Sequence, residues 1–231
     1  MTPTDVIVRS FVDLRAFADT TMPAPGDFLL ARTKLAGQGN GLSVMACAPQ
    51  GAGLVTAMPA DEFVIVLTGE LNIGANVLGP DGCIVMPKGS AFSWAAAPGT
   101  RAIAMRCDTS TPGAQTPVVI DPNPVLAPSA SPSAAVLAGP APTCRSFNDY
   151  KSANGELRCG TWSATPYARR AVRYAHAELM YLIEGSVTLV DGAGREKTFS
   201  KGDIFLVERG AECAWDNRET VRKVYVIFRP A

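Results

Sequence analysis

The chain has 231 residues, and its 21 basic and 21 acidic side chains cancel to a formal net charge of zero. A chain without excess positive charge has no field that would draw it to nucleic acid or to an anionic membrane, so we expect neither partner. No uncharged apolar run reaches the length of a membrane-spanning helix, and the N-terminus lacks the basic start and apolar stretch of a signal peptide. We therefore expect a cytoplasmic protein.

The histidine and cysteine content restricts the chemistry further. His176 is the only histidine, which excludes any site built from several imidazoles of one subunit. The six cysteines form no CxxC pair of the zinc or thioredoxin type, and reduced thiols are expected in a chain without a signal peptide. Any metal site would need other ligands.

The first half of the chain, residues 1–107, has the pattern of short β-strands. Its apolar segments are β-branched and end in glycine, as in FVIVLTG and CIVMPKG. Residues 108–143 follow with eight of the 18 prolines and hardly any charge. Proline fixes φ and removes a hydrogen-bond donor, so this stretch is predicted to be a Pro/Ala-rich linker. Its apolar pieces, PVVI and AAVL, could still pack against the domains.

The second half, residues 144–231, repeats the first. Glu62–Gly69 matches Glu178–Gly185, and the turn and tryptophan that follow recur in the same order. Arg101 likewise matches Arg222, and VRSFVDL near the start matches CRSFNDY just after the linker. Each half again consists of strands at close spacing, with turns at glycine. We predict a tandem duplication of a small antiparallel β-barrel or sandwich, closed so that few edges are exposed.

Each copy resembles a cupin barrel. The resemblance rests on a glutamate followed by a glycine, then a glycine-aspartate step, a PxG-type turn and a closing strand, which in the second copy are Glu178, Gly185, Gly202-Asp203 and Gly210. The ending, a tryptophan followed by RKVY, resembles the branch of (S)-ureidoglycine aminohydrolase and ethanolamine-utilisation cupins. The resemblance implies an all-β chain of two tandem cupin (RmlC-like jelly-roll) barrels.

The resemblance also implies where a metal would bind. Metal-binding cupins usually offer an HxH pair, the motif glutamate and a third histidine. Carried onto the second copy, these positions hold Val172 and Tyr174 (or Ala171 and Arg173), then Glu178 and Cys213. On the first copy they hold Thr56, Met58, Glu62 and Phe92. Most of the usual ligands are missing from each barrel, so no cofactor is expected.

The second barrel is nevertheless predicted to contain a polar pocket. Strand side chains alternate, so Tyr174 and His176 point into the barrel if Glu178 does. His176, Glu178 and Cys213 would be the ligand set if a divalent metal is bound, which is the alternative for the cofactor. Lone buried carboxylates are costly, so Glu62 and Glu178 should each be protonated, paired or solvated. The predicted ligand-binding residues are Tyr174, His176, Glu178, Cys213, Trp215 and Arg222.

Arg222 and its first-copy counterpart have a second interpretation. Each follows a tryptophan at the same spacing, so each arginine could hold a substrate carboxylate or stack on the indole as a structural cation–π contact. Because the arginine recurs in both copies, the structural contact is favoured. The first barrel is expected to have only apolar or small residues beside Glu62, and to be structural or to bind something apolar.

We therefore predict that the protein binds a small polar metabolite in its C-terminal barrel without a tightly held transition metal. One alternative is a metal-assisted hydrolase or isomerase acting on a small nitrogenous or carbohydrate-derived substrate, as the resemblance implies. The other is a non-catalytic structural or regulatory module. The two barrels are expected to pack as an intramolecular pseudo-dimer, and a homodimer of the chain is a further option.

Overall fold

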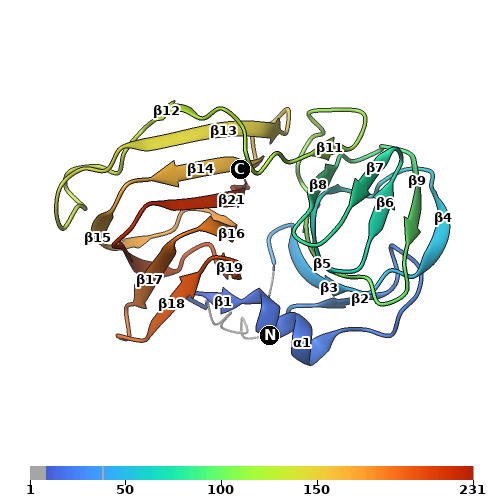
Figure 1. Cartoon of the computed structure of the whole chain (residues 1–231), viewed down its shortest axis with the longest axis horizontal. Coiled ribbons are helices and arrows are strands. Elements are labelled where there is room, and N and C mark those ends of the chain that lie inside the picture. Colours follow the sequence, from blue (N-terminus) through green and yellow to red (C-terminus); the bar gives the residue numbers. More distant parts are fainter. Residues whose placement is uncertain (1–8, 38, 231) are drawn as a thin grey trace, which may run out of the picture.

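A computed structural model describes residues 9–37 and 39–230, and these form two β-barrels that lie side by side (Figure 1). The single α-helix among them, α1 (Leu14–Thr21), lies at the bottom of the view, close to the N-terminal barrel. Within the described ranges, no helix combines the length and apolarity that crossing a membrane requires.

The N-terminal barrel consists of a six-stranded and a four-stranded antiparallel sheet. In sheet order, the strands of the larger sheet are β11 (Val118–Val119), β8 (Cys83–Met86), β5 (Asp61–Thr68), β10 (Arg101–Cys107), β3 (Leu42–Cys47) and β2 (Arg32–Lys34). Those of the smaller sheet are β4 (Gly51–Val55), β9 (Phe92–Ala96), β6 (Leu71–Ile73) and β7 (Asn76–Leu78).

The C-terminal barrel consists of a seven-stranded and a four-stranded antiparallel sheet. In sheet order, the strands of the larger sheet are β1 (Val12–Asp13), β19 (Ile204–Val207), β16 (Ala177–Glu184), β21 (Val221–Phe228), β14 (Leu157–Ala164), β13 (Cys144–Lys151) and β12 (Ala127–Ser129). Those of the smaller sheet are β15 (Tyr167–Arg173), β20 (Glu212–Asn217), β17 (Ser186–Asp191) and β18 (Glu196–Ser200).

The two barrels repeat the same strand pairings, as the sequence repeat predicts. Glu62 and Glu178 are each the second residue of a central strand, β5 and β16. Each central strand lies between a four-residue strand and a long closing strand, β8 and β10 in one barrel, β19 and β21 in the other. The closing strand shifts register against the central strand near its first residues in both copies. The all-β prediction with two tandem barrels is confirmed.

The segments that precede the two barrels are exchanged between them. Val12 and Asp13 in β1 precede the N-terminal barrel but pair with β19 of the C-terminal barrel. β11 follows the N-terminal barrel in the linker, and pairs with β8, the counterpart of β19. Strand pairing therefore crosses the sequence boundaries at residues 107 and 143. The similarity between Val8–Leu14 and Cys144–Tyr150 does not carry over, because CRSFNDY forms β13, which lies between β14 and β12. Val8 itself lies outside the described residues.

The linker runs along the surface and is tied to both barrels (Figure 1). The PVVI piece contributes β11, and Ile120 is buried in the core between the barrels. The AAVL piece packs against the C-terminal barrel, where Leu137 forms an isolated bridge with Arg169. These apolar contacts fix the ends of a segment whose prolines prevent longer strands.

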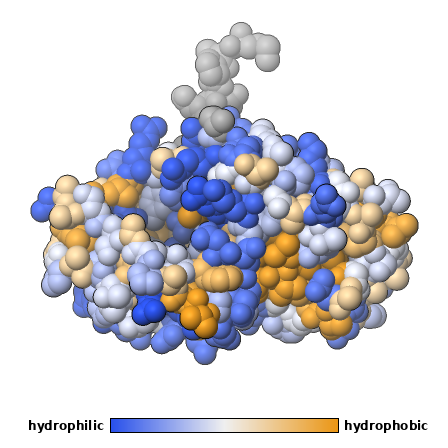
Figure 2. All heavy atoms as spheres, turned by 90° about the horizontal axis from the view of Figure 1, so that it is seen from above, coloured by the Kyte–Doolittle hydropathy of each residue, from blue (hydrophilic) through white to orange (hydrophobic). Residues whose placement is uncertain are grey.

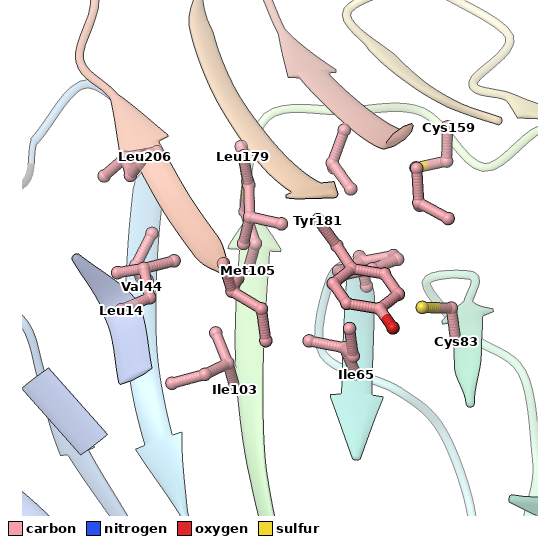
Figure 3. Packing of buried hydrophobic residues seen from close by; sticks show 14 of the residues in the cluster. Leu14, Val44, Ile65, Cys83, Ile103, Met105, Cys159, Leu179, Tyr181 and Leu206 are labelled. Carbon is pink, nitrogen blue, oxygen red and sulfur yellow. The ribbon is translucent and has the colours of Figure 1, made fainter. Parts of the chain in front are cut away.

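One apolar core joins the two barrels. It contains Ile65 and Met105 from the N-terminal barrel together with Leu179 and Leu206 from the C-terminal barrel, which face each other in Figure 3. Each barrel has a second core in its own interior. The large sheets are therefore buried on both faces, which explains why strands such as FVIVLTG are apolar throughout and do not alternate. The burial of so many apolar side chains between the barrels holds them together.

Candidate functional site

A cavity of about 720 Å³ opens in the C-terminal barrel. Its lining comes from both sheets of this barrel, and the linker contributes Ser129 and Ala130. The charged residues of the lining are four arginines, one lysine and one carboxylate: Arg158, Arg169, Arg173, Arg229, Lys223 and Glu178. The cavity is thus strongly cationic, although the whole chain is neutral.

Four of the six predicted site residues line this cavity: Tyr174, His176, Glu178 and Trp215. Cys213 and Arg222 are not among the lining residues. Trp162 and Tyr167 also contribute to the wall. Tyr174 and His176 lie in the connection between β15 and β16, and Ala175 between them also lines the cavity, so strand alternation does not govern this segment.

Glu178 is held by a buried lysine. Lys223 Nζ donates to Glu178 Oε1 at 2.8 Å and lies 3.0 Å from Met180 Sδ. The same ammonium lies over two indole rings, 4.9 Å from the centroid of Trp162 and 5.0 Å from that of Trp215. Burial would raise the pKa of the Glu178 carboxyl, but the charge of Lys223 and the hydrogen bond from His176 outweigh it and lower this pKa to about 2. Glu178 is therefore ionised and paired, as expected for a buried carboxylate.

His176 connects the carboxylate to the rim of the cavity. Its Nε2 lies 3.5 Å from Glu178 Oε2, and Arg229 Nη2 lies 3.3 Å from its Nδ1. A guanidinium can only donate, so Nδ1 must accept, and the ring proton of a neutral imidazole is then on Nε2, directed at Glu178. Tyr174 packs edge-on against the imidazole with the ring centroids 5.6 Å apart.

Arg169 fixes the other side of the site. Its Nη2 donates to the Tyr174 hydroxyl at 2.6 Å, and its guanidinium lies over the Tyr174 ring at 5.3 Å from the centroid. Burial raises the pKa of Tyr174, so the phenol stays protonated. Tyr167 stacks on Trp215 next to it. The cavity thus combines guanidinium groups with a continuous aromatic wall.

Cys213 occupies a different environment from the one predicted. Its Sγ lies 3.2 Å from the backbone oxygen of Ser10, so the thiol faces the N-terminal segment that crosses from the other barrel. Burial raises its pKa to about 11, which disfavours the thiolate needed for metal binding or nucleophilic attack. The sequence could not reveal this contact, because it joins residues at opposite ends of the chain.

The predicted arginine–tryptophan contacts are replaced by others. Among the described residues, the cation over Trp215 is Lys223, whereas Arg222 Nη2 lies 3.4 Å from the oxygen of Pro124 in the linker. Arg101 binds the end of α1 through the Ala18 oxygen and the Asp19 carboxylate. Neighbouring residues of a strand face opposite sides, so Lys223 points into the barrel and Arg222 points away from it.

The N-terminal barrel contains a charged cluster beside Glu62, contrary to the prediction of apolar or small neighbours. Arg32 Nη1 and Arg106 Nε each lie 2.7 Å from Glu62 Oε2. Burial would raise the pKa of Glu62, but the two guanidinium groups outweigh it and lower this pKa. Glu62 is therefore paired, as the cost of a lone carboxylate requires. Arg106 alternates with Ala102 and Ala104 along β10, which is the signal that could have found it.

The residues present do not fit the metal site of the usual cupin pattern. Of the C-terminal positions that the pattern implies, Val172 offers no ligand atom, the phenol of Tyr174 is protonated, and Cys213 does not line the cavity. Glu178 already neutralises an ammonium at hydrogen-bond distance. No group of three or more His, Cys, Asp or Glu side chains suited to a metal occurs within residues 9–37 and 39–230.

A second, smaller hollow of about 420 Å³ lies between the linker and the two barrels. Its lining is mainly apolar and includes Val77, Val119, Tyr181 and Val224. Figure 2 views the molecule from above relative to Figure 1 and shows apolar residues gathered over the half that the N-terminal barrel forms. The carboxylate of Asp81 is the one charged group of this lining, and Asn123 and Tyr181 add polar side chains.

Comparison with known proteins identifies the fold. Residues 151–225 match the family described as EutQ-like cupin domain. A protein of unknown function of the DUF861 family from Pseudomonas syringae pv. tomato str. DC3000 is 29% identical, with a TM-score of 0.77 over 82% of this chain and 83% of that one. Curated proteins give no match.

More distant structures extend the fold similarity along the chain. A cupin 2 conserved barrel domain protein from Leptotrichia buccalis is 13% identical, with a TM-score of 0.60 over 96% of this chain and 97% of that one. Salicylate 1,2-dioxygenase from Pseudoaminobacter salicylatoxidans is 11% identical, with a TM-score of 0.56 over 99% of this chain and 86% of that one. At these identities the similarity concerns the fold alone.

Proposed function

We propose that this chain, a two-barrel protein of the cupin superfamily, binds a small anionic metabolite in its C-terminal barrel without a resident transition metal. The observation that carries the proposal is the charge of the cavity lining, where five basic side chains face one carboxylate. Because Lys223 neutralises Glu178, the four arginines are left to attract a ligand of opposite charge.

The arginines suit carboxylate or phosphate groups better than neutral polar ones. A guanidinium presents two parallel N–H donors that match the two oxygens of such a group. Arg229 at the rim and Arg169 deeper in the cavity each use part of their donors on protein partners, which fixes their planes. A ligand would therefore meet guanidinium groups already in position, and binding would cost little side-chain ordering.

The aromatic wall supports a ligand with a flat or apolar portion. Trp162 packs edge-on against Trp215 with the centroids 6.2 Å apart, and Tyr167 stacks on Trp215. Apolar area and a few polar groups that converge on one point are the usual composition of a metabolite site. Lys223 sits between the indoles and fills the role that a metal cation has beside a cupin glutamate.

The test measures thermal unfolding with panels of carboxylates, phosphates and neutral polar compounds, in the presence of EDTA. A ligand at about 100 times its dissociation constant should stabilise the protein by about 2.7 kcal/mol. Arg169→Gln and His176→Ala should remove most of that stabilisation. Arg218→Gln is the matched control, because Arg218 lies in the same barrel with its side chain 90% exposed.

Two results would count against the proposal. The first is an equal stabilisation of the wild type and both cavity variants by the same ligand. The second is stabilisation that disappears with EDTA and returns with manganese, nickel, iron or zinc, since that would assign the site to a metal. We also propose a cytoplasmic location, which the six unpaired cysteines support because thiols stay reduced there.

A further inference from the structure

The charged cluster of the N-terminal barrel leaves three buried polar atoms without a partner. Arg32 and Arg106 both bind the same oxygen of Glu62, Oε2. Within the described part of the chain, Arg32 Nη2, Arg106 Nη2 and Glu62 Oε1 have no hydrogen-bond partner, and all three are buried. Buried polar atoms are normally satisfied, so two donors and one acceptor here lack a complement.

The cluster is also unbalanced in charge. Two guanidinium groups face a single carboxylate whose side chain is fully buried. The neighbouring Cys47 supplies no negative charge, because burial raises the pKa of its thiol to about 12. Asp27 also attracts Arg32 but is exposed to solvent, so inside the barrel the two guanidinium groups share one carboxylate. A water molecule could satisfy the hydrogen bonds but would leave this imbalance of charge uncompensated.

The corresponding positions of the other barrel show that the cluster is particular to this one. Arg106 pairs with Glu62 across β10 and β5, and the residue that pairs with Glu178 in the same way is Ile227. Lys223, the cation of the C-terminal barrel, corresponds to Ala102, because each pairs with the same position of its central strand. The two glutamates are thus neutralised by cations at different strand positions, and the N-terminal cluster has no equivalent in the C-terminal cavity.

We propose that the N-terminal barrel is a second binding site, for a small oxyanion that carries a hydroxyl group. An anionic oxygen would accept from Arg32 Nη2 and Arg106 Nη2, and the hydroxyl would donate to Glu62 Oε1. The ligand would supply the missing charge and complete all three hydrogen bonds. Short 2-hydroxycarboxylates and hydrogencarbonate share this chemistry. Arg106 is 19% exposed, so the cluster lies close to solvent.

The experiment is a ligand-observed NMR titration of the full chain with three probes: glycolate, hydrogencarbonate and acetate. Glycolate or hydrogencarbonate should bind, and acetate should bind about tenfold more weakly than glycolate because it lacks the hydroxyl that donates to a carboxylate. Binding of glycolate alone indicates an organic hydroxy acid, and binding of hydrogencarbonate alone indicates the inorganic source; either result supports the site. Equal binding of acetate and glycolate, or no binding of any probe, would overturn it and leave a water-filled cluster.

Variants assign the binding to this barrel. Arg106→Lys keeps the charge but removes the second donor, and should weaken binding about tenfold, whereas Lys34→Gln removes a charge from an exposed residue of β2 and should not. If Lys223→Met abolishes the binding and Arg106→Lys does not, the probe occupies the other barrel and the inference fails. Because Arg106→Lys could impair folding, the wild type is also modified with phenylglyoxal. Glycolate should protect Arg106 from modification, as read by peptide mass spectrometry, and absence of protection would contradict the site.

Discussion

Replacement of Lys223 by methionine tests the electrostatic core of the C-terminal cavity. Methionine keeps most of the volume between Trp162 and Trp215 but leaves Glu178 buried without its cation. The shift of the Glu178 pKa from 4.5 to about 2 corresponds to about 3 kcal/mol of interaction with the ionised form. Removal of one partner of a buried pair costs about 3–5 kcal/mol, so we expect Lys223→Met to lower the free energy of unfolding by that amount at pH 7.

The loss should depend on pH in a defined direction. In the wild type the folded-state pKa of Glu178 lies below its unfolded value, so its contribution is present above about pH 4.5 and is lost as the pH falls toward 2. In the variant, burial without Lys223 should raise the folded-state pKa instead, and the carboxyl will protonate before the protein reaches pH 4. The difference between wild type and variant should therefore shrink from pH 7 to pH 4.

Urea unfolding followed by tryptophan fluorescence and circular dichroism at pH 7 and pH 4 measures both effects. The double variant Lys223→Met, Glu178→Gln is the control, because it removes both charges and should recover part of the lost stability. A loss below about 0.5 kcal/mol at pH 7, or a loss of equal size at both pH values, would refute the assignment of Glu178 as a buried ion whose charge Lys223 stabilises.

Two further predictions concern the joint between the barrels and the thiols. The hydroxyl of Tyr150 donates to Asp61 Oδ2 at 2.9 Å and so links the two barrels. Tyr150→Phe should lower the free energy of unfolding by about 1–2 kcal/mol, which a lower midpoint of thermal unfolding would report. An unchanged midpoint would show that this hydrogen bond does not stabilise the protein. All six cysteines are unpaired and buried, and burial raises the pKa of Cys213 to about 11. Ellman's reagent should therefore find no fast-reacting thiol in the folded protein at pH 8 and six thiols after denaturation. Rapid labelling of Cys213 in the folded protein would contradict its burial against Ser10.

The sequence predicts the fold well because duplication repeats the signals. Glycines and short β-branched segments recur in the same order in both halves, and each recurrence strengthens the other. The sequence does not predict that β1 and β11 are exchanged between the barrels. Each is a two-residue strand, and nothing in so short a segment indicates which of two similar sheets it will join.

The candidate site was predicted only in part, for a physical reason. Tyr174, His176 and Glu178 line the cavity, but the alternation expected along a strand does not place them there, because Tyr174 and His176 lie in the connection between β15 and β16. On β21 the same rule cannot choose between Arg222 and Lys223, because one face of this strand packs against the other barrel and the opposite face lines the cavity. Both faces are then largely apolar, and the two-residue period that would identify the inner face disappears.

The core between the barrels has a consequence for how the two copies diverged. Residues that face the neighbouring barrel are bound by mutual packing, so a change on one side demands a matching change on the other. The interior core of each barrel is free of that constraint, because it is separate from the core between the barrels. The interior of each barrel can therefore change without disturbing the contact between the two barrels. The two glutamates at matching positions are thus neutralised by a lysine in one barrel and by a pair of arginines in the other.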